Sequence, residues 1–225
     1  MKPYYQDSAV TIYHGDCREV VPTLGRFDLL LTDPPYGLGD RMKGGTWGCS
    51  AKYDKMREWD TEAPDLGFLL ALGLPSIIWG GNYFALPPSR CWLSWSKTNA
   101  VPTMASMELA WTNFDKPAKE YRGKVGTHDT GHPTQKPLPL FHWCLGLVPE
   151  AQTVLDPFAG SGTTGRAAKD LGRKAVLIER EEKYCEIAAR RMGQEVLCFD
   201  NLNAAGQGRR EATYPEPACS QGGCQ

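Results

Sequence analysis

The sequence lacks the features that mark a metal site, a disulfide scaffold or a membrane span. Its eight cysteines are scattered and include no Cys-x-x-Cys pair, so no metal site is predicted. No apolar run approaches the ~20 residues that cross a bilayer, and residues 1–7 lack the apolar stretch of a signal peptide. We therefore expect a cytoplasmic protein without membrane contact, with reduced and mostly buried thiols.

A strong charge of one sign is also missing, since the net charge is −1. Nucleic-acid binders often carry a basic patch, so the local distribution matters more than the sum. Two polar segments, 38–63 and 115–131, are locally basic. Solvated loops are the ordinary interpretation of such segments, but a long loop in a compact domain is commonly functional.

Short apolar runs alternate with helical patterns, which predicts an α/β fold. Strands are expected at residues 10–13, 27–31, 76–79, 153–155 and 175–178, and helices at 17–24, 66–74, 138–147, 164–171 and 183–192. Residues 91–95 and 108–112 are expected to form an antiparallel pair at the sheet edge. One domain over residues 1–202 is predicted, followed by a flexible tail, 203–225, without apolar periodicity.

A glycine-rich turn follows the strand at 153–155. Residues 160–165 spell Gly-x-Gly-x-x-Gly and open a helix, where free amides and the helix dipole can face a ligand. Glu179 ends the next strand, 19 residues on (179 − 160), where a carboxylate can accept hydrogen bonds from ribose hydroxyls. A nucleoside site is predicted. The alternatives are a turn that only packs the helix tightly, and a dinucleotide dehydrogenase.

A second unusual turn, Asp33-Pro34-Pro35-Tyr36, ends the apolar strand at 27–31. The two prolines fix φ and remove backbone donors, which leaves rigid acceptors and an aromatic ring. Such stiffness suits a reactive site. A proline-stiffened surface turn is the alternative.

With both turns in place, the sequence resembles the amino-methylating DNA methyltransferases. Their signatures are an Asp-Pro-Pro-Tyr catalytic turn and an Asp-Pro-Phe-x-Gly-Ser-Gly-Thr cofactor loop, matched here by residues 33–36 and 156–163. The order of the two is similar to the family's permuted β group, whose His-Pro-Thr-Gln-Lys-Pro segment stands at 132–137. The resemblance covers about residues 10–200. It implies a single Rossmann-like methyltransferase fold of the α/β class, circularly permuted, with a mostly parallel sheet and an antiparallel edge.

The resemblance also implies a role for each matching residue. Catalysis falls to Asp33, Pro34, Pro35 and Tyr36, with Asp33 and the Pro34 carbonyl accepting from the amino group of a flipped base on which Tyr36 stacks. The cofactor S-adenosyl-L-methionine would contact Asp16, Thr134, Lys136, Asp156, Phe158, Gly160, Ser161, Gly162, Thr163, Thr164 and Glu179. Asp16 would face the cofactor's adenine, Glu179 its ribose, and Thr134 with Lys136 its methionine carboxylate. A plain surface lysine is the alternative for Lys136.

Double-stranded DNA is the partner that the resemblance implies. The candidate DNA-contacting loops are 38–63 and 115–131, with candidate contacts at Arg41, Lys43, Lys116, Lys119 and Arg122. Adenine N6 is the favoured target, because Asp at the first position of the turn is commoner in the family's adenine enzymes; cytosine N4 is the alternative. An RNA or protein amide methyltransferase and, remotely, an NAD-dependent oxidoreductase stay open. A homodimer and a cognate restriction endonuclease stay open as partners.

Overall fold

The computed structural model describes residues 1–38, 60, 62–101, 105–125 and 135–194. Residues 1–194 belong to one compact unit. Its strands are β1 (Tyr5–Gln6), β2 (Val10–His14), β3 (Leu29–Thr32), β4 (Ser76–Trp79), β5 (Leu93–Lys97), β6 (Met107–Thr112), β7 (Lys119–Gly123), β8 (Thr153–Asp156) and β9 (Lys174–Glu179). Its helices are α1 (Cys17–Val20), η1 (Val21–Thr23), α3 (Gly67–Leu70), η3 (Gly81–Tyr83), α4 (Leu138–Gly146), α5 (Thr163–Asp170) and α6 (Glu182–Met192).

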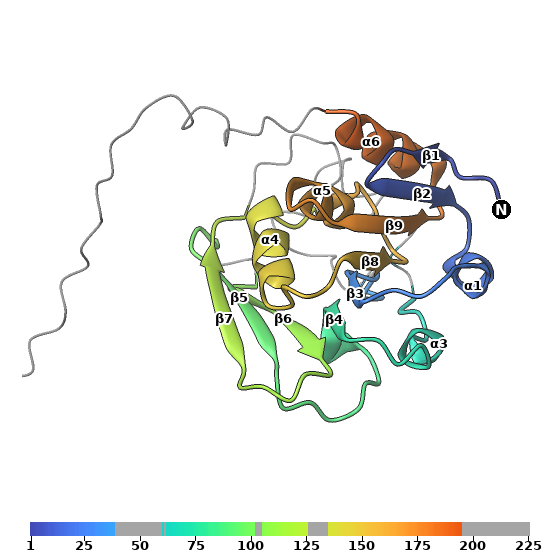
Figure 1. Ribbon diagram of the computed structural model, residues 1–225. Helices are drawn as coiled ribbons and strands as arrows, with labels where there is room; N and C mark the ends of the chain where they lie inside the picture. Colours follow the sequence, from blue (N-terminus) through green and yellow to red (C-terminus); the bar gives the residue numbers. More distant parts are fainter. Residues whose placement is uncertain (39–59, 61, 102–104, 126–134, 195–225) are drawn as a thin grey trace, which may run out of the picture. The chain divides into compact units, whose positions relative to one another are not determined.

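The strands of the described residues form one sheet in the order β1-β2-β9-β8-β3-β4-β6-β5-β7 (Figure 1). The five strands from β2 to β4 run parallel to one another. Antiparallel pairing joins β1 to β2, β4 to β6 and β6 to β5, whereas β7 is parallel to β5. The prediction of a mostly parallel α/β sheet is confirmed.

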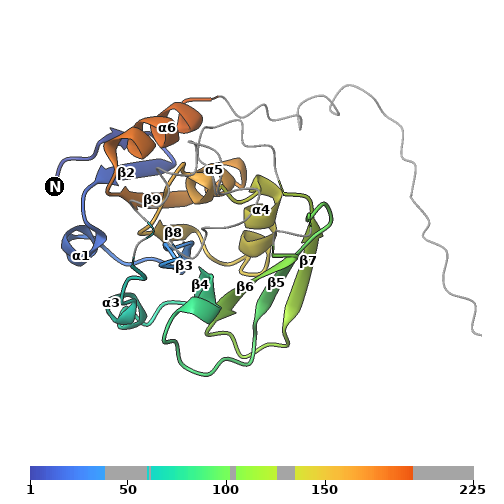
Figure 2. The same ribbon diagram turned by 180° about the vertical axis from the view of Figure 1, so that it is seen from behind.

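Helices cover both faces of the sheet, which explains why its central strands are apolar on both sides. The larger core lies under α4, α5 and α6, and takes Leu29 and Leu31 of β3. The smaller core lies under α1 and α3, and takes Leu30 of the same strand. Figure 2 shows the sheet from behind, with α1 and α3 on one side of the strands. The continuous apolar runs in the sequence therefore belong to strands that are buried on both faces of the sheet.

The chain runs outward in both directions from the boundary between β3 and β8. From β8 it continues through α5 to the neighbouring β9, and from β3 it continues through α3 to β4 on the other side. β3 and β8 are themselves parallel partners, with Leu30 opposite Leu155. Two crossovers that diverge in this way leave a crevice outside the carboxyl ends of the two strands, which is where ligands bind in open α/β sheets.

The first strand of the chain closes the other half of the sheet. β2 lies parallel to β9 with His14 opposite Glu179, and α6 packs against β2. Gly15 and Asp16, which follow β2, therefore lie beside the carboxyl end of the strand that ends at Glu179.

Two predicted helices are shorter than the sequence indicated. The helix expected at 17–24 is α helical only to Val20 and continues as the 3-10 turn η1, because Pro22 has no N–H to continue the α hydrogen bonds. The helix expected at 66–74 is only α3, Gly67–Leu70. Gly73 adopts a φ of +64°, and Pro75 disfavours a helical residue before it, so the chain turns early into β4.

The edge of the sheet also differs from the prediction. β5 and β6 are an antiparallel pair as expected, but β7 lies outside them. Residues 119–123, predicted to belong to a loop, are therefore a strand. Its sequence is polar because one long side of an edge strand faces solvent, and charged side chains are typical there. Tyr121 packs against the larger core and fixes the face that the strand turns inward.

The described cysteines, Cys17, Cys91, Cys144 and Cys185, are free and buried. Among the described residues, no three His, Cys, Asp or Glu side chains gather as a metal site requires. The helices described here are all too short or too polar to span a membrane. The predicted domain boundary at 202/203 lies outside the described residues.

Gly81→Ala should destabilise the fold. A Cβ at Gly81 would lie 2.5 Å from Trp111 Cβ and 2.7 Å from the Trp111 backbone nitrogen, so β4 and β6 would have to separate. We expect a loss of about 1–3 kcal/mol in the free energy of unfolding, measured by urea denaturation. Gly146→Ala is the matched control, since its Cβ would meet open space at the end of α4 and should cost nothing. Equal stabilities for the two variants would contradict this account of Gly81.

Candidate functional site

A cavity of about 910 Å³ opens at the carboxyl edge of the parallel strands. Its lining comes from the segments that follow β2, β3, β4, β8 and β9, together with residues of β5, β6 and the stretch before α4. The Asp33-Pro34-Pro35-Tyr36 turn and the glycine turn both line it, because they follow the two strands of the sheet's divergence point. The two turns, 123 residues apart (156 − 33), thus share one crevice.

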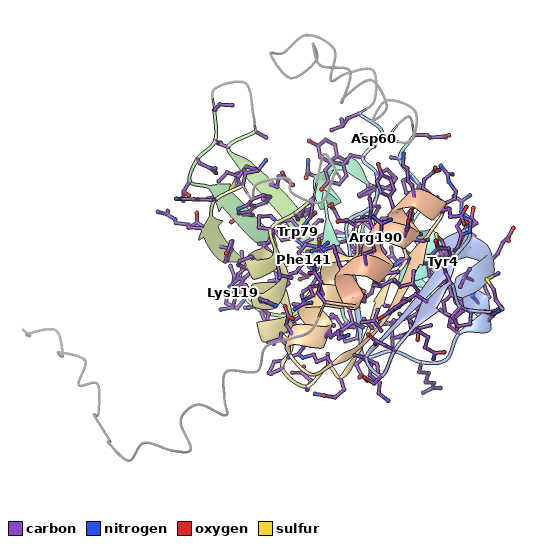
Figure 3. The ribbon with its side chains drawn as sticks, turned by 90° about the horizontal axis from the view of Figure 1, so that it is seen from above. Tyr4, Asp60, Trp79, Lys119, Phe141 and Arg190 are labelled. Atoms are coloured by element: carbon purple, nitrogen blue, oxygen red, sulfur yellow. The ribbon has the colours of Figure 1, made fainter. Side chains whose placement is uncertain are left out.

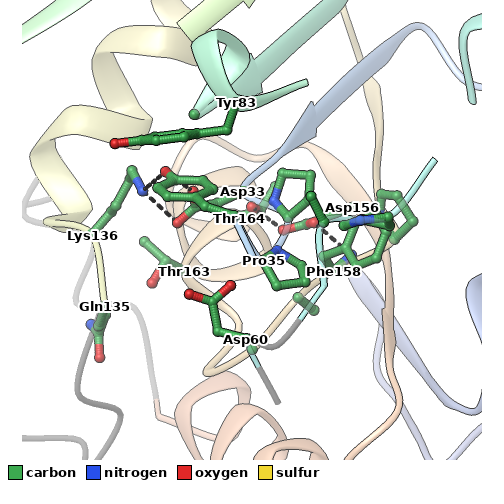
Figure 4. Close-up of a pocket in the computed structure, with 18 of the residues that line it drawn as sticks. Asp33, Pro35, Asp60, Tyr83, Gln135, Lys136, Asp156, Phe158, Thr163 and Thr164 are labelled. Carbon is green, nitrogen blue, oxygen red and sulfur yellow. Dashed lines mark hydrogen bonds and ion pairs between the residues drawn. The ribbon is translucent and has the colours of Figure 1, made fainter. Parts of the chain in front are cut away.

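Three polar groups meet at the first of these turns (Figure 4). Tyr36 Oη donates to Asp33 Oδ1 at 2.6 Å. Lys136 Nζ donates to Asp33 Oδ2 at 2.5 Å and to Tyr36 Oη at 2.8 Å. The Lys136 side chain is only 6% exposed, so the alternative of a plain surface lysine is wrong. It lies at the Asp33 carboxylate.

Two further charges, absent from the sequence prediction, complete this cluster. Glu108 of β6 places Oε2 3.2 Å from Lys136 Nζ and Oε1 2.6 Å from Lys97 Nζ of β5. Burial raises the pKa of Asp33, and Lys136 only partly offsets this. Burial acts in the same direction on Glu108, but Lys136 and Lys97 outweigh it and hold the pKa of Glu108 below its ordinary value. We call Lys97, Glu108, Lys136 and Asp33 the charge quartet.

The Tyr36 ring is held between β4's end and a second tyrosine. Tyr83 stacks on it with ring centroids 4.8 Å apart and an interplanar angle of 17°. On the backbone side, Gly80 has a φ of +68°, and any Cβ there would collide with the Tyr36 ring. The ring of Tyr83 is 44% exposed. The site therefore offers a stacked aromatic pair whose outer member faces the cavity mouth.

Asp60 fixes the far end of the same turn. Its buried carboxylate accepts from the Gly37 amide at 2.7 Å and the Leu38 amide at 3.3 Å. Burial raises the pKa of Asp60, and the backbone donors only partly oppose it. Since Pro34 and Pro35 supply no donors, the amides just beyond them are where a carboxylate can anchor the turn.

The glycine turn opens α5 as predicted, and two of its glycines have packing roles. Gly162 has a φ of +78°, and a Cβ there would lie 2.9 Å from Ala188 Cβ of α6. A Cβ at Gly165 would lie 2.6 Å from Leu177 Cδ1 of β9. The tight-packing alternative is thus true of these two positions. It does not account for Gly160, Ser161, Thr163 and Thr164, which line the cavity.

Glu179 lies where the sequence placed it, beside the glycine turn. Its Oε2 accepts from the Gly160 amide and its Oε1 from the Glu181 amide, both at 2.8 Å. Each carboxylate oxygen has a second acceptor position, so two hydroxyls of a ligand can still bind. Asp16 lines the same part of the cavity and caps α1 by accepting from the Arg18 amide at 2.8 Å.

Asp156 joins the end of β3, just before the Asp-Pro-Pro-Tyr turn, to the glycine turn. Its Oδ1 accepts from Thr32 Oγ1 at 2.7 Å and from the Phe158 amide at 3.1 Å, and its Oδ2 accepts from Thr164 Oγ1 at 2.5 Å. Burial raises the pKa of Asp156 to about 6. With these bonds made inside the protein, Asp156 holds the cofactor loop in shape, and its direct contact with a cofactor stays a prediction.

Arg191 of α6 secures the loop from outside the cavity. Its Nη1 donates to the Ser161 carbonyl oxygen at 2.6 Å and contacts Ser161 Oγ at 3.1 Å and Thr163 Oγ1 at 3.3 Å. The two hydroxyls predicted to contact a cofactor are therefore oriented by a guanidinium about 30 residues away in sequence.

The candidate DNA contacts that the structure describes, Lys116, Lys119 and Arg122, do not line the cavity. Thr134, Arg41 and Lys43 lie outside the described residues. Lys119 and Arg122 are exposed on β7, and Lys116 precedes that strand. Figure 3 shows Lys119 well apart from Asp60, which lines the cavity. Val125, two residues after β7, lines the cavity. The carboxyl end of the strand, with Arg122, is therefore nearer to the cavity than Lys119 at its start.

The residues that the sequence analysis missed carried weak signals. Glu108 is a charge in an otherwise apolar strand, and Lys97 ends a strand of alternating Trp and Ser. Either could equally be a solvent-facing residue. Tyr83 and Asp60 followed no motif, and their partners lie 47 and 23 residues away (83 − 36, 60 − 37). Only the folded chain brings them to the Asp-Pro-Pro-Tyr turn.

Comparison with known proteins gives a family match. A family model described as DNA methylase matches residues 76–190, about half of the chain. The type II methyltransferase M.HinfI of Haemophilus influenzae is 29% identical over 85% of this chain and 70% of its own length. The type II methyltransferase M2.DpnII of Streptococcus pneumoniae is 25% identical over 86% of this chain and 93% of its own length.

Solved structures share the fold. The cytosine-N4-specific PvuII DNA methyltransferase superposes with a TM-score of 0.56 at 15% identity, over 84% of this chain and 88% of that one. M1.HpyAVI, solved as a complex with S-adenosylmethionine, superposes with a TM-score of 0.51 at 22% identity, over 81% of this chain and 99% of that one. The predicted fold class is confirmed.

Asp156→Asn should remove a pH dependence of stability. Because the pKa of Asp156 is raised from 3.8 to about 6, the folded protein keeps a proton between these values that the unfolded chain has released. The free energy of unfolding of the wild type should therefore fall, relative to the variant, by about 2 kcal/mol as the pH rises from 4 to 6. Urea denaturation at several pH values measures it.

Asp7→Asn is the control of opposite sign. Despite burial, the hydrogen bond from Lys169 and two backbone amides lower the pKa of Asp7 to about 2. Asp7 therefore adds stability above its unfolded pKa of 3.8, which is lost as the pH falls towards 2. Parallel stability curves for the wild type and Asp156→Asn would refute the raised pKa.

Proposed function

Since this chain belongs to the DNA methylase family that modifies the amino groups N6 of adenine or N4 of cytosine, we propose that it methylates adenine N6 in double-stranded DNA, with S-adenosyl-L-methionine as methyl donor. The observation that carries the proposal is the single cavity that Asp33-Pro34-Pro35-Tyr36 and the glycine turn line together. Transfer between two bound molecules requires this closeness, because the reacting atoms must be aligned within a few ångström.

The residues present fit the cofactor. When bound, S-adenosylmethionine supplies a methyl group already activated on a sulfonium. Glu179 keeps two acceptor positions for the ribose hydroxyls, and Asp16 lies at the neighbouring strand end for the adenine. The Gly160 to Thr164 turn presents its amides and the start of α5 to the methionine part. An oxidoreductase would share only this turn, whereas the Asp-Pro-Pro-Tyr turn is left unexplained by it.

Asp33 and the Pro34 carbonyl would act on the target amino group. The lone pair of such a nitrogen is delocalised into the ring, which makes it a poor nucleophile. Two acceptors for its N–H groups would favour tetrahedral geometry and free the lone pair for the methyl group that the cofactor would supply, and Asp33 would receive the N–H proton that the methylated nitrogen releases. Asp33 is held in position by Tyr36 and Lys136 before a base arrives, so its carboxylate already faces the place where charge develops on nitrogen.

The stacked pair of Tyr36 and Tyr83 supports a flipped base. A base inside a duplex cannot reach the cavity, and extruding it costs a few kcal/mol. Stacking on an aromatic side chain contributes roughly 1–3 kcal/mol per base. Tyr83 already covers one face of Tyr36, so we propose the pair, rather than Tyr36 alone, as the surface that receives the base.

A covalent mechanism at a ring carbon has no support in the described part of the site. Such chemistry needs a thiolate, and Cys17 is the cysteine that lines the cavity. Burial raises the pKa of Cys17 to about 11, so its thiol is protonated at neutral pH. Attack by an amino nitrogen needs no such group.

The finer parts of the proposal rest on the sequence and the relatives. Adenine is favoured by Asp33 at the first position of the turn, and cytosine N4 is the second candidate, since the structurally similar PvuII enzyme is cytosine-N4-specific. The relatives named above are type II methyltransferases, which supports a cytoplasmic enzyme with a cognate restriction endonuclease. A homodimer would supply a second DNA-reading surface beside the short 115–131 segment.

Asp33→Ala should lower methyl transfer by about a hundredfold or more, because a preorganised acceptor is lost from the transition state. Binding of S-adenosylhomocysteine should remain within about twofold, since the cofactor residues are not changed. The measurement is transfer of labelled methyl from S-adenosylmethionine to unmethylated DNA, followed by nucleoside analysis. Glu186→Ala, on the exposed face of α6, is the control.

The same assay separates the alternatives. Label in RNA or protein but not in DNA would show that DNA is not the substrate. N4-methylcytosine in the DNA would show that cytosine, not adenine, is the target base. Thermal stabilisation by NAD instead of S-adenosylhomocysteine would favour the oxidoreductase. Normal turnover by Asp33→Ala would defeat the mechanism.

Arg41 and Lys43 are proposed DNA contacts in segment 38–63, with Lys116, Lys119 and Arg122 as further candidates. Arg41→Glu with Lys43→Glu should weaken DNA binding and flatten its salt dependence, since each lost phosphate contact reduces the salt slope by about one. Fluorescence anisotropy at several salt concentrations measures both. Lys174→Glu should leave the slope unchanged, because Lys174 is the first residue of β9 and lies at the amino ends of the strands, away from the cavity. An unchanged slope in the double variant would leave segment 38–63 without a role in binding.

A further inference from the structure

Both oxygens of the Asp33 carboxylate are engaged within the protein. Oδ1 accepts from Tyr36 Oη, and Oδ2 accepts from Lys136 Nζ at 2.5 Å. In the proposed function, the target amino group must donate to this same carboxylate. Lys136 is itself a nitrogen donor to Oδ2, so a target amino group that takes the same acceptor position must displace it.

Lys136 is buried, so its ammonium cannot leave Asp33 by moving into water. Its side chain is 6% exposed, and its ammonium also lies 5.3 Å from the Tyr36 ring centroid and 5.7 Å from that of Trp79. A buried ammonium that loses a carboxylate partner without gaining another is costly. Displacement of Lys136 from Asp33 therefore requires a second anion within reach.

Glu108 is that anion. Its Oε2 lies 3.2 Å from Lys136 Nζ, further than the 2.5 Å to Asp33, so a small shift of the ammonium exchanges the closer partner. Its Oε1 is held at 2.6 Å by Lys97, whose side chain is 7% exposed and lies 5.1 Å from the centroid of the Trp95 ring. Lys97 thus anchors Glu108 with its other oxygen turned towards Lys136.

We propose that Glu108 is a positioning residue for methyl transfer, which takes Lys136 over when the target amino group displaces it from Asp33. The inference rests on the proposed function and extends it to a residue on β6 that no motif includes. Lys136 would then remain neutralised throughout, and Asp33 would be released to the substrate without leaving an unpaired charge in the site.

The charges around the quartet are consistent with this exchange. Asp33 faces Lys136, Tyr36 and Glu108, and it lies close enough to Asp156 to raise the pKa of that carboxyl. Lys136 faces both carboxylates and, from α4, the Cys144 thiol. Two cations and two anions balance, so the exchange moves a hydrogen bond without changing the net charge of the site.

The experiment compares Glu108→Gln, Lys136→Met and the double variant, in the full chain, with Glu186→Gln as the matched carboxylate-to-amide control. Single-turnover methyl transfer to unmethylated DNA is measured across pH, with S-adenosylhomocysteine binding and the melting temperature beside it. Wild-type transfer to DNA tests the proposed function separately, because its failure would appear before any variant is examined and would overturn both.

Glu108→Gln should slow transfer by about tenfold at the plateau of its pH profile, since Lys136 then has no second carboxylate. Adding Lys136→Met should restore part of that rate, because the competitor for Asp33 is removed. Lys136→Met alone should move the acidic limb of the profile to higher pH, since Lys136 lowers the pKa of Asp33, whereas Glu108→Gln should not.

Two outcomes would overturn the inference while the wild type remains active. One is a Glu108→Gln rate within about twofold of the wild type. The other is a double variant slower than Glu108→Gln, above all with a lowered melting temperature, because a merely structural carboxylate would show additive damage. A Glu186→Gln variant as slow as Glu108→Gln would overturn it as well.

Discussion

The parallel pairing of β3 with β8 is the constraint on which the rest of the site depends. Each strand ends in a turn of unusual chemistry, and because parallel neighbours end at the same edge, the two turns must face one crevice. The chain leaves this boundary in opposite directions, so none of the described crossover helices closes over it. A cavity of about 910 Å³ is the result, with the acceptor turn and the glycine turn as adjoining walls.

The cavity contains a buried carboxylate whose charge the surrounding residues must neutralise. Asp33 stands among apolar and aromatic groups that would favour its neutral form, and burial does raise its pKa. Lys136, in the segment before α4, opposes this effect of burial, and it is paired in turn with Glu108 of β6, which Lys97 of β5 holds. The antiparallel extension of the sheet therefore does more than complete the fold, because it delivers the carboxylate that neutralises Lys136.

The glycine turn shows how packing and binding share one segment. Gly162 and Gly165 let α5 approach α6 and β9, while Gly160 and the hydroxyls of Ser161, Thr163 and Thr164 face the cavity. Asp156 below and Arg191 behind hold these groups in place. A rigid turn of this kind can present amides to a ligand without first paying to order them.

The sequence by itself determined the class of fold, the parallel central strands, and the two turns with Glu179 and Asp16, because each depends on local periodicity or on a short motif. It wrongly predicted a loop where the edge strand β7 lies, since a polar edge strand and a loop have similar compositions. Only the tertiary structure decided that Lys136 meets Asp33 rather than solvent, and that Glu108, Lys97, Tyr83 and Asp60 surround the same turn. These contacts join residues 11 to 103 positions apart (108 − 97, 136 − 33), and no local pattern records which distant partner a buried charge or ring will meet.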